Sequence, residues 1–263
     1  MLEAKRVKLV ILAGGYGSRL GNITNTIPKP MVPIGGKPII WHIMKSYAHY
    51  GIKEFVICLG YKGHVIKDYF LHYDANNNDF TVNLKDNSLE FHNRHDELDW
   101  KVTLVDTGLN TLKGGRLKRI EEYLDDGLNL LTYGDGLANI DIEQLIDFHK
   151  KTQKIVTISG VHPPARFGEL IADGDVLTSF EEKAQTSQGM INGGYMVFNK
   201  ELFKYLTPDE NCDLEADVLE SLATQGKVAV YKHDGLWACM DHERDHSHLE
   251  KLWETDNAFW KVW

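Results

Sequence analysis

The stretch that decides the fold is residues 7–38, which read VKLVILAGGYGSRLGNITNTIPKPMVPIGGKP. Val7–Ala13 is a short apolar run that predicts a buried strand, and the glycine- and proline-rich segment Gly14–Gly36 predicts a long loop. Beyond this loop, short apolar runs alternate with longer amphipathic runs. Continuous apolar strands that alternate with helices predict a parallel sheet whose two faces are both covered.

The expected elements continue this alternation. We expect strands over Glu54–Leu59, Lys101–Asp106, Leu128–Tyr133 and Ile155–Val161, and helices over Pro38–Tyr50, Val65–His72, Gly115–Leu124 and Ile142–Lys150. In the more strand-rich second half we expect strands over Glu169–Ala172, Val176–Glu181 and Tyr195–Phe198, and a helix over Leu214–Ala223.

The domain organisation follows from the same pattern, because no linker or internal repeat divides the chain. We expect one α/β domain over residues 1–240, with a mixed, mainly parallel central sheet flanked by helices and an excursion at about 74–100. A C-terminal helix and aromatic tail over residues 241–263 would pack on this domain or form a subunit contact.

The composition limits the class of protein. The chain has 263 residues, of which 43% are hydrophobic and 25% are charged, as in ordinary soluble globular domains. Its formal net charge of −9 argues against nucleic acid or an anionic membrane as a partner. Cys58, Cys212 and Cys239 are far apart and odd in number, which suits neither a disulfide framework nor a cysteine metal site. Since no apolar run approaches the ~20 residues that span a bilayer, we expect a soluble, cytoplasmic protein.

The loop after the first strand has the chemistry of a phosphate site. Gly14, Gly15 and Gly17 lack a Cβ, so backbone amides there can approach a polyphosphate closely. Arg19 and Lys29 add positive charge, and a proline on each side of Lys29 restricts the backbone that carries it. The loop matches neither the Walker A motif nor the dinucleotide-binding glycine motif, because its glycine spacing differs from both. The alternative is a glycine turn with solvated charges.

The motif GGYGSRL at residues 14–20, followed by PKP at 28–30, resembles the signature of the nucleotidyltransferases that activate sugar 1-phosphates. The resemblance covers essentially the whole chain and implies a Rossmann-like, glycosyltransferase-A-like domain. The segments most similar to the glucose-1-phosphate cytidylyltransferase branch are Pro38–His42, Gly51–Lys53, Val105–Gly108, Gly114–Arg119 and Tyr133–Gly136. Membership of that branch implies that CTP and α-D-glucose 1-phosphate, or a similar phosphorylated acceptor, react to give CDP-glucose and pyrophosphate with the help of Mg²⁺.

The resemblance also implies a set of nucleotide-binding residues. They are Leu12, Ala13, Gly14, Gly15, Tyr16, Gly17, Ser18, Arg19, Lys29, Thr111, Arg116 and Gly134. Thr111 and Arg116 would recognise the base, and a donor is chemically reasonable there because cytosine presents acceptors at O2 and N3. The alternative for that segment is a helix N-terminus entered through the glycine pair at 114–115, and both interpretations can hold together.

Two carboxylates are the candidate metal ligands. Asp135 follows a predicted strand, and Asp241 follows the short apolar segment Leu236–Met240. Two carboxylates from different segments suit Mg²⁺, whose remaining ligands would be phosphates and water. The resemblance implies that Asp135 is also catalytic, together with Arg19 and Lys29, and that Lys29 contacts the α-phosphate of the nucleotide.

The residues of the acceptor side are carried over by the resemblance. Gly168, Glu182, Lys183, Asn192 and Gly193 match the positions that bind the sugar phosphate in the family. Lys183 would hold the attacking phosphate, and Glu182 would accept hydrogen bonds from sugar hydroxyls. The family usually has proline after this lysine, whereas alanine follows it here, and this departure bears on the identity of the acceptor. The alternative is a solvated turn.

Two alternatives to this enzyme remain open. The same chemistry could use UTP or dTTP, or another phosphorylated acceptor, and a homologue without catalysis could sense nucleotides. The charged positions expected for catalysis are all present, which favours an enzyme. Residues 253–263 contain three tryptophans and one phenylalanine. This aromatic tail and the resemblance both favour a homo-oligomer.

Overall fold

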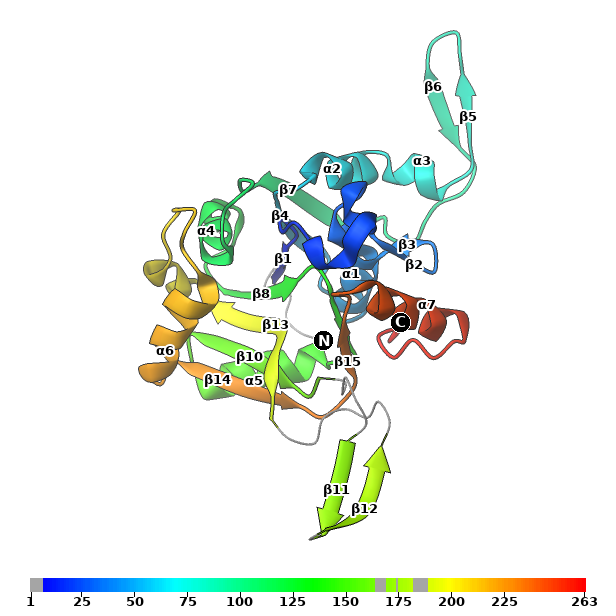
Figure 1. Cartoon of the computed structure of the whole chain (residues 1–263). Helices are drawn as coiled ribbons and strands as arrows, with labels where there is room; N and C mark the ends of the chain where they lie inside the picture. Colours follow the sequence, from blue (N-terminus) through cyan, green and yellow to red (C-terminus); the bar gives the residue numbers. More distant parts are fainter. Residues whose placement is uncertain (1–6, 164–168, 174, 182–188) are drawn as a thin grey trace.

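A seven-stranded sheet forms the centre of the computed structural model, which describes residues 7–163, 169–173, 175–181 and 189–263. In spatial order its strands are β14 (Val228–His233), β10 (Val156–Val161), β13 (Ile191–Asn199), β8 (Leu128–Tyr133), β1 (Lys8–Leu12), β4 (Glu54–Leu59) and β7 (Lys101–Asp106) (Figure 1). Neighbouring strands run parallel, except that β13 is antiparallel to both β10 and β8. The predicted mixed, mainly parallel sheet is confirmed.

The remaining elements cover the sheet or project from it. The α-helices are α1 (Ile39–His49), α2 (Gly63–Leu71), α3 (Tyr73–Asn77), α4 (Lys113–Arg119), α5 (Ile142–Thr152), α6 (Glu220–Thr224) and α7 (Glu243–Glu254). Shorter helical turns are η1 (Ser18–Asn25), η2 (Lys29–Met31), η3 (Glu121–Tyr123), η4 (Lys200–Tyr205) and η5 (Leu214–Leu219). The small strand pairs are β2 (Pro33–Ile34) with β3 (Lys37–Pro38), β5 (Phe80–Asn83) with β6 (Ser88–Phe91), β9 (Gly136–Ala138) with β15 (Trp237–Cys239), and β11 (Glu169–Asp173) with β12 (Val176–Glu181).

The central strands are buried on both faces, which explains their continuous apolar sequences. Along β1, Leu9 and Ile11 belong to the apolar cluster that includes α1, α5 and α7, whereas Val10 and Leu12 belong to the cluster that includes α4 and α6. Successive side chains of a strand point to opposite faces, so one apolar strand supplies both clusters. Among the described residues, no helix is long and apolar enough to cross a membrane.

Several predicted boundaries were wrong. The segment predicted as one long loop after β1 contains η1, η2 and β2. The helix predicted over Gly115–Leu124 begins earlier and ends at Arg119, where η3 follows, and the helix predicted over Leu214–Ala223 divides into the π-helical turn η5 and the short α6. The strand predicted over Tyr195–Phe198 is longer, because β13 begins at Ile191. Tertiary packing determines where these helices and strands begin and end, and the local sequence pattern carries no information about that packing.

The C-terminal tail packs on the face of the sheet that carries α1. Trp260 is fully buried, and its indole nitrogen donates to Nδ1 of the buried His42 over 3.3 Å. The other ring nitrogen of His42 lies 2.8 Å from the carbonyl oxygen of Ile34. Trp253 and Trp263 place their rings within 6.3 Å of the same imidazole. The aromatic tail therefore closes over α1.

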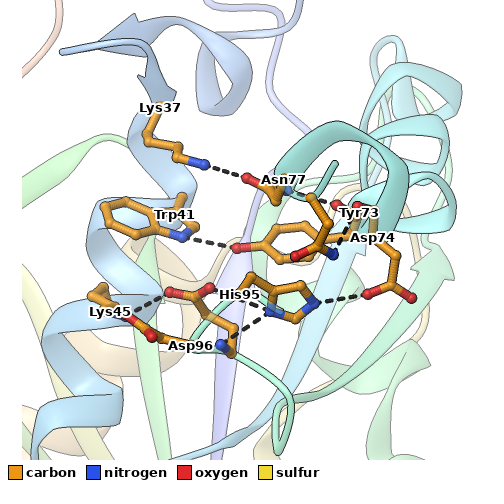
Figure 2. A network of polar contacts seen from close by, with 10 residues as sticks. Lys37, Trp41, Lys45, Tyr73, Asp74, Asn77, His95 and Asp96 are labelled. Atoms are coloured by element: carbon orange, nitrogen blue, oxygen red, sulfur yellow. Dashed lines mark hydrogen bonds and ion pairs between the residues drawn. The ribbon is translucent and has the colours of Figure 1, made fainter. Parts of the chain in front are cut away.

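The excursion at residues 74–100 is a hairpin with an anchored base. Every residue of β5 and β6 is exposed, and the hairpin stands away from the body (Figure 1). At its base, the Trp41 indole donates to the Tyr73 hydroxyl over 2.9 Å, and Nε2 of His95 lies 2.8 Å from an Asp74 oxygen (Figure 2). Lys45 also pairs with the buried Glu97 at 2.5 Å. These contacts tie both ends of the excursion to α1.

Candidate active site

A pocket of about 660 Å³ opens at the carboxyl ends of β1 and β8, beside the glycine-rich loop. Ligands in open α/β sheets bind at this edge. The predicted site residues that line it are Leu12, Ala13, Gly14, Gly15, Tyr16, Gly17, Ser18, Arg19, Lys29, Thr111, Arg116, Gly134, Asp135, Asn192 and Asp241. The fold therefore brings the expected nucleotide side, both candidate metal ligands and one residue of the expected acceptor side into one pocket.

The glycines of the loop meet different local requirements. Gly17 has a φ of 65°, a left-handed conformation that favours glycine. A Cβ on Gly14 would lie 2.2 Å from the Nη1 atom of Arg116, whereas a Cβ on Gly15 would have no neighbour within 4 Å. Gly14 is thus required by close packing against Arg116, and Gly15 leaves open space where a ligand can approach.

Lys29 is the charged centre of the pocket. Its Nζ atom lies 2.6 Å from an oxygen of Asp135 and 2.6 Å from an oxygen of Asp241, while only 11% of its side chain is exposed. Burial opposes the charge of Lys29, but attraction and hydrogen bonds from the two carboxylates outweigh burial and raise its pKa. Arg19, whose side chain is 66% exposed, lies 3.1 Å from the second oxygen of Asp241.

The charge of Asp241 is stabilised by these cations. Burial acts against its ionised form, but hydrogen bonding and attraction from Lys29, aided by Arg19, lower the pKa of Asp241 below its ordinary value. Lys29 and Asp241 are therefore oppositely charged at neutral pH. The contact joins residues 212 positions apart in the chain.

The two carboxylates fit a magnesium ion. Both already share one cation, the ammonium group of Lys29, so their oxygens converge on a single point. The described part of the chain contains no group of three or more histidine, cysteine, aspartate or glutamate side chains able to hold a metal. Mg²⁺ commonly binds through one or two carboxylates, with phosphates and water as its other ligands. The donor set therefore suits a metal that is bound together with a phosphate-bearing substrate.

Arg116 holds the nucleotide side of the pocket together. Its Nη1 donates to the Leu59 carbonyl, the Thr107 hydroxyl and the Gly108 carbonyl at 2.7–2.9 Å, and its Nη2 donates to the Gly14 and Leu109 carbonyls at 3.1–3.2 Å. These groups follow or end β1, β4 and β7. Burial is the main reason that its pKa is lowered. Base recognition by Arg116 stays a prediction, because these five hydrogen bonds all go to groups of the protein itself.

Thr111, the other residue predicted to recognise the base, is buried. Its hydroxyl oxygen accepts a hydrogen bond from Nη1 of Arg119 over 2.9 Å. The hydroxyl proton stays available for an acceptor in the pocket. Its role toward the base also stays a prediction.

The acceptor side is described only in part. Gly168, Glu182 and Lys183 lie outside the described residues. Asn192 lines the pocket and donates to the Tyr133 hydroxyl over 3.0 Å. The Gly193 carbonyl accepts from the Trp237 indole over 2.8 Å, and a Cβ there would lie 2.5 Å from Val161, so close packing requires this glycine.

The sequence reasoning missed a second polar group in the pocket wall. The hydroxyl of Tyr133 and the ammonium of Lys113 both hydrogen-bond the same Glu215 oxygen, and the ammonium lies 4.6 Å from the centre of the Tyr133 ring. This group joins α4, the end of β8 and η5. The position of Tyr133 directly before Gly134-Asp135-Gly136 was an available signal, but no motif marks Glu215.

The fold and the pocket define an α/β protein with a candidate phosphate-binding site at the carboxyl edge of its sheet. A family model described as "Nucleotidyl transferase" matches residues 8–254. The chain therefore belongs to the nucleotidyl transferase family, as its loop motif predicted.

Known relatives match over nearly the full length. The chain is 48% identical to a glucose-1-phosphate cytidylyltransferase of Salmonella typhi, over 98% of this chain and 100% of that protein. It is 41% identical to a probable glucose-1-phosphate cytidylyltransferase of Bacillus subtilis (strain 168), with the same coverage. The crystal structure of HddC from Yersinia pseudotuberculosis superposes with a TM-score of 0.67 at 25% identity, over 94% of this chain and 99% of that one. The predicted class of enzyme and the predicted fold are confirmed.

Proposed function

We propose that this protein transfers the cytidylyl group of CTP to α-D-glucose 1-phosphate, which yields CDP-glucose and pyrophosphate. The convergence of Lys29, Asp135 and Asp241 on one point beside the glycine-rich loop is the observation that carries the proposal. The names of the full-length relatives from Salmonella typhi and Bacillus subtilis support the choice of CTP and glucose 1-phosphate.

The proposed chemistry is an in-line displacement at the α-phosphorus of CTP. A phosphate oxygen of the acceptor forms a new bond to this phosphorus, and the bond to the oxygen that bridges to the β-phosphate breaks, so pyrophosphate leaves with the bond's electron pair. The acceptor oxygen is already ionised at neutral pH, so the reaction needs no general base. Catalysis then rests on positioning and on stabilisation of charge.

Residues of this chain supply most of that stabilisation. The backbone amides of the loop at 14–18 would hold the phosphates, and Arg19 and Lys29 would oppose the negative charge that builds up at the α-phosphate. Asp135 and Asp241 would hold Mg²⁺, which when bound neutralises phosphate charge and favours departure of pyrophosphate. Lys183 and Glu182 are proposed to bind the sugar phosphate.

The first experiment is an assay of pyrophosphate release over a panel of substrates. CTP with glucose 1-phosphate should give the highest kcat/KM, and UTP, dTTP and other sugar 1-phosphates should be poorer. Turnover of UTP or dTTP at the same rate would contradict the choice of donor. Tight CTP binding without any product would instead indicate a nucleotide sensor.

The second experiment tests the metal site. Asp135→Asn should lower kcat by about a hundredfold or more, because it removes one of the charges that hold the ion beside the phosphates. Asp147→Asn, which changes an exposed carboxylate on α5, is the matched control and should keep the parent activity. Near-parent turnover by Asp135→Asn would contradict the metal assignment.

We also propose that the protein is a homo-oligomer and works in the cytoplasm. The apolar side chains exposed on β5 and β6 support self-association. The free thiols of Cys58, Cys212 and Cys239 suit a reducing compartment.

We propose residues 1–240 as the nucleotidyltransferase domain and residues 241–263 as an appended helix and tail.

A further inference from the structure

The ammonium group of Lys29 lies between the two carboxylates that are the candidate metal ligands. Its nitrogen lies 2.6 Å from an oxygen of Asp135 and 2.6 Å from an oxygen of Asp241, so it forms an ion pair with both carboxylates. We propose that Lys29 occupies the divalent-cation position in the nucleotide-free protein and yields it only when a nucleoside triphosphate supplies a new anionic partner. This inference rests on the proposed function, which it extends to the order in which metal and nucleotide bind.

The packing of Lys29 fixes the point from which its ammonium reaches the two carboxylates. The residue begins η2 between two prolines, and a Cβ placed on Gly17 would lie 3.0 Å from the Cβ of Lys29. The backbone and the first part of the side chain are therefore closely confined, which leaves the end of the chain as the part that can move. A short swing of this end would transfer the ammonium from the carboxylates to a phosphate at the mouth of the pocket.

The local charge explains why a metal alone would bind weakly. The charges of Lys29 and Arg19 cancel those of the two aspartates, so a divalent cation approaches a neutral cluster and meets the ammonium at the point of convergence. The described residues supply no third carboxylate, histidine or cysteine to this group. Protein oxygens alone thus give Mg²⁺ few ligands, and the ion normally keeps water and phosphate in such sites.

A bound triphosphate reverses this balance. Its oxygens attract the ammonium of Lys29, which frees both carboxylates, and they also complete the coordination of the metal. Metal and nucleotide therefore favour each other's binding, and thermodynamic linkage makes that coupling reciprocal. Once pyrophosphate has left, Lys29 can return to the two aspartates and so disfavour retention of the metal.

The test measures the affinity of the nucleotide-free protein for Mn²⁺. Binding is monitored through the electron paramagnetic resonance signal of the Mn²⁺ that stays free in solution. Lys29→Met should bind Mn²⁺ about tenfold or more tightly than the parent, because a positive charge next to the metal has been removed. Arg19→Gln is the matched control: of the two carboxylates, the charge that it removes contacts Asp241, and it is largely exposed, so its effect should be clearly smaller. Equal Mn²⁺ affinity of the parent and Lys29→Met, or equal gains in the two variants, would overturn the proposal.

A second measurement uses the unaltered protein, so that it does not depend on the folding of Lys29→Met. Crystals soaked in MnCl₂ should show no anomalous peak between Asp135 and Asp241, and a peak should appear when CTP is added. A peak without nucleotide would overturn the proposal. Because Mn²⁺ binding without nucleotide is independent of turnover, failure of the substrate panel and failure of this test are distinguishable.

Discussion

At the scale of single residues, the shape of the site depends on the hydrogen bonds of one buried side chain, Arg116. Arg116 is a buried cation whose hydrogen bonds all go to neutral oxygens, among them the carbonyl of Gly14. Five such bonds fix the ends of three strands relative to one another. The shape of the nucleotide side therefore depends on the space that Gly14 leaves for the guanidinium.

This dependence gives a prediction with an adjacent control. Gly14→Ala should lower the free energy of unfolding by about 1–3 kcal/mol, because its methyl group would overlap Arg116 and force it to shift. Gly15→Ala meets no atom within 4 Å and should change stability by at most about 0.5 kcal/mol. Urea unfolding of both variants measures the difference. Equal stability of the two variants would show that the guanidinium moves aside without cost.

The residues of the site were predictable to different degrees. The glycines, Arg19 and Lys29 lie in one continuous motif after an apolar strand, so the sequence alone placed them at one ligand-binding edge. The contact between Lys29 and Asp241 spans 212 positions and has no local pattern, so it required the resemblance and then the fold. The hydrogen bonds of Arg116 to four main-chain carbonyls and the Thr107 hydroxyl were also beyond sequence reasoning, because the positions of these groups depend on how three loops meet.

At the scale of elements, one of the contacts that dock the C-terminal tail on α1 requires a neutral histidine. Burial is the main cause that lowers the pKa of His42 to about 4, and it outweighs the backbone hydrogen bonds at Ile34 and Lys37, which act to raise the pKa. Neutral His42 can donate from Nε2 to the Ile34 carbonyl and accept at Nδ1 from Trp260, whereas a protonated ring could no longer accept. Protonation of this ring would therefore remove the hydrogen bond that Trp260 donates to it and place a charge among the aromatic rings of the tail.

The stability of the protein should fall in acid for this reason. An unfolded histidine takes up a proton near pH 6.5, so the contribution of His42 is complete above that pH and is lost as pH falls toward 4. The expected loss is about 1.4 kcal/mol per pH unit in that window. His42→Gln should flatten the decline of unfolding free energy between pH 6.5 and 4, whereas His64→Gln, at an exposed position, should not. An unchanged slope in His42→Gln would contradict this assignment.

The elements themselves were predictable where burial leaves a pattern. β4, β7 and β8 match their predicted bounds because their apolar runs end where the strands end. The edge strand β14 escaped prediction although it is no more exposed than β7, the other edge strand, so the degree of burial does not explain this difference. The hairpin formed by β5 and β6 was expected only as an excursion, since a fully exposed strand pair has no buried face to set its sequence.

At the scale of the whole molecule, the contacts within one chain do not explain why the hairpin of β5 and β6 exposes apolar side chains. Phe80 pairs with Phe91 and Val82 with Leu89, so four apolar side chains that are 40–51% exposed lie in two neighbouring pairs. A two-stranded hairpin without a packed face is at best marginally stable in water. Its base is nonetheless tied to α1 by the contacts around Tyr73 and His95 (Figure 2). An anchored ribbon with exposed apolar pairs is suited to contact another copy of the chain.

We therefore expect the proposed homo-oligomer to depend on this ribbon. Phe80→Asp combined with Phe91→Asp places like charges opposite each other and removes the apolar pair, so it should reduce the mass measured by light scattering after size-exclusion chromatography. Val230→Asp is the control, because it charges an exposed apolar position on β14 at the opposite edge of the sheet and should leave the mass unchanged. An unaltered mass for the Phe80, Phe91 double variant would exclude the hairpin as an essential contact. A circular dichroism spectrum like the parent's would show that any loss of mass reflects a lost interface, since the hairpin contributes nothing to the two buried clusters of the sheet.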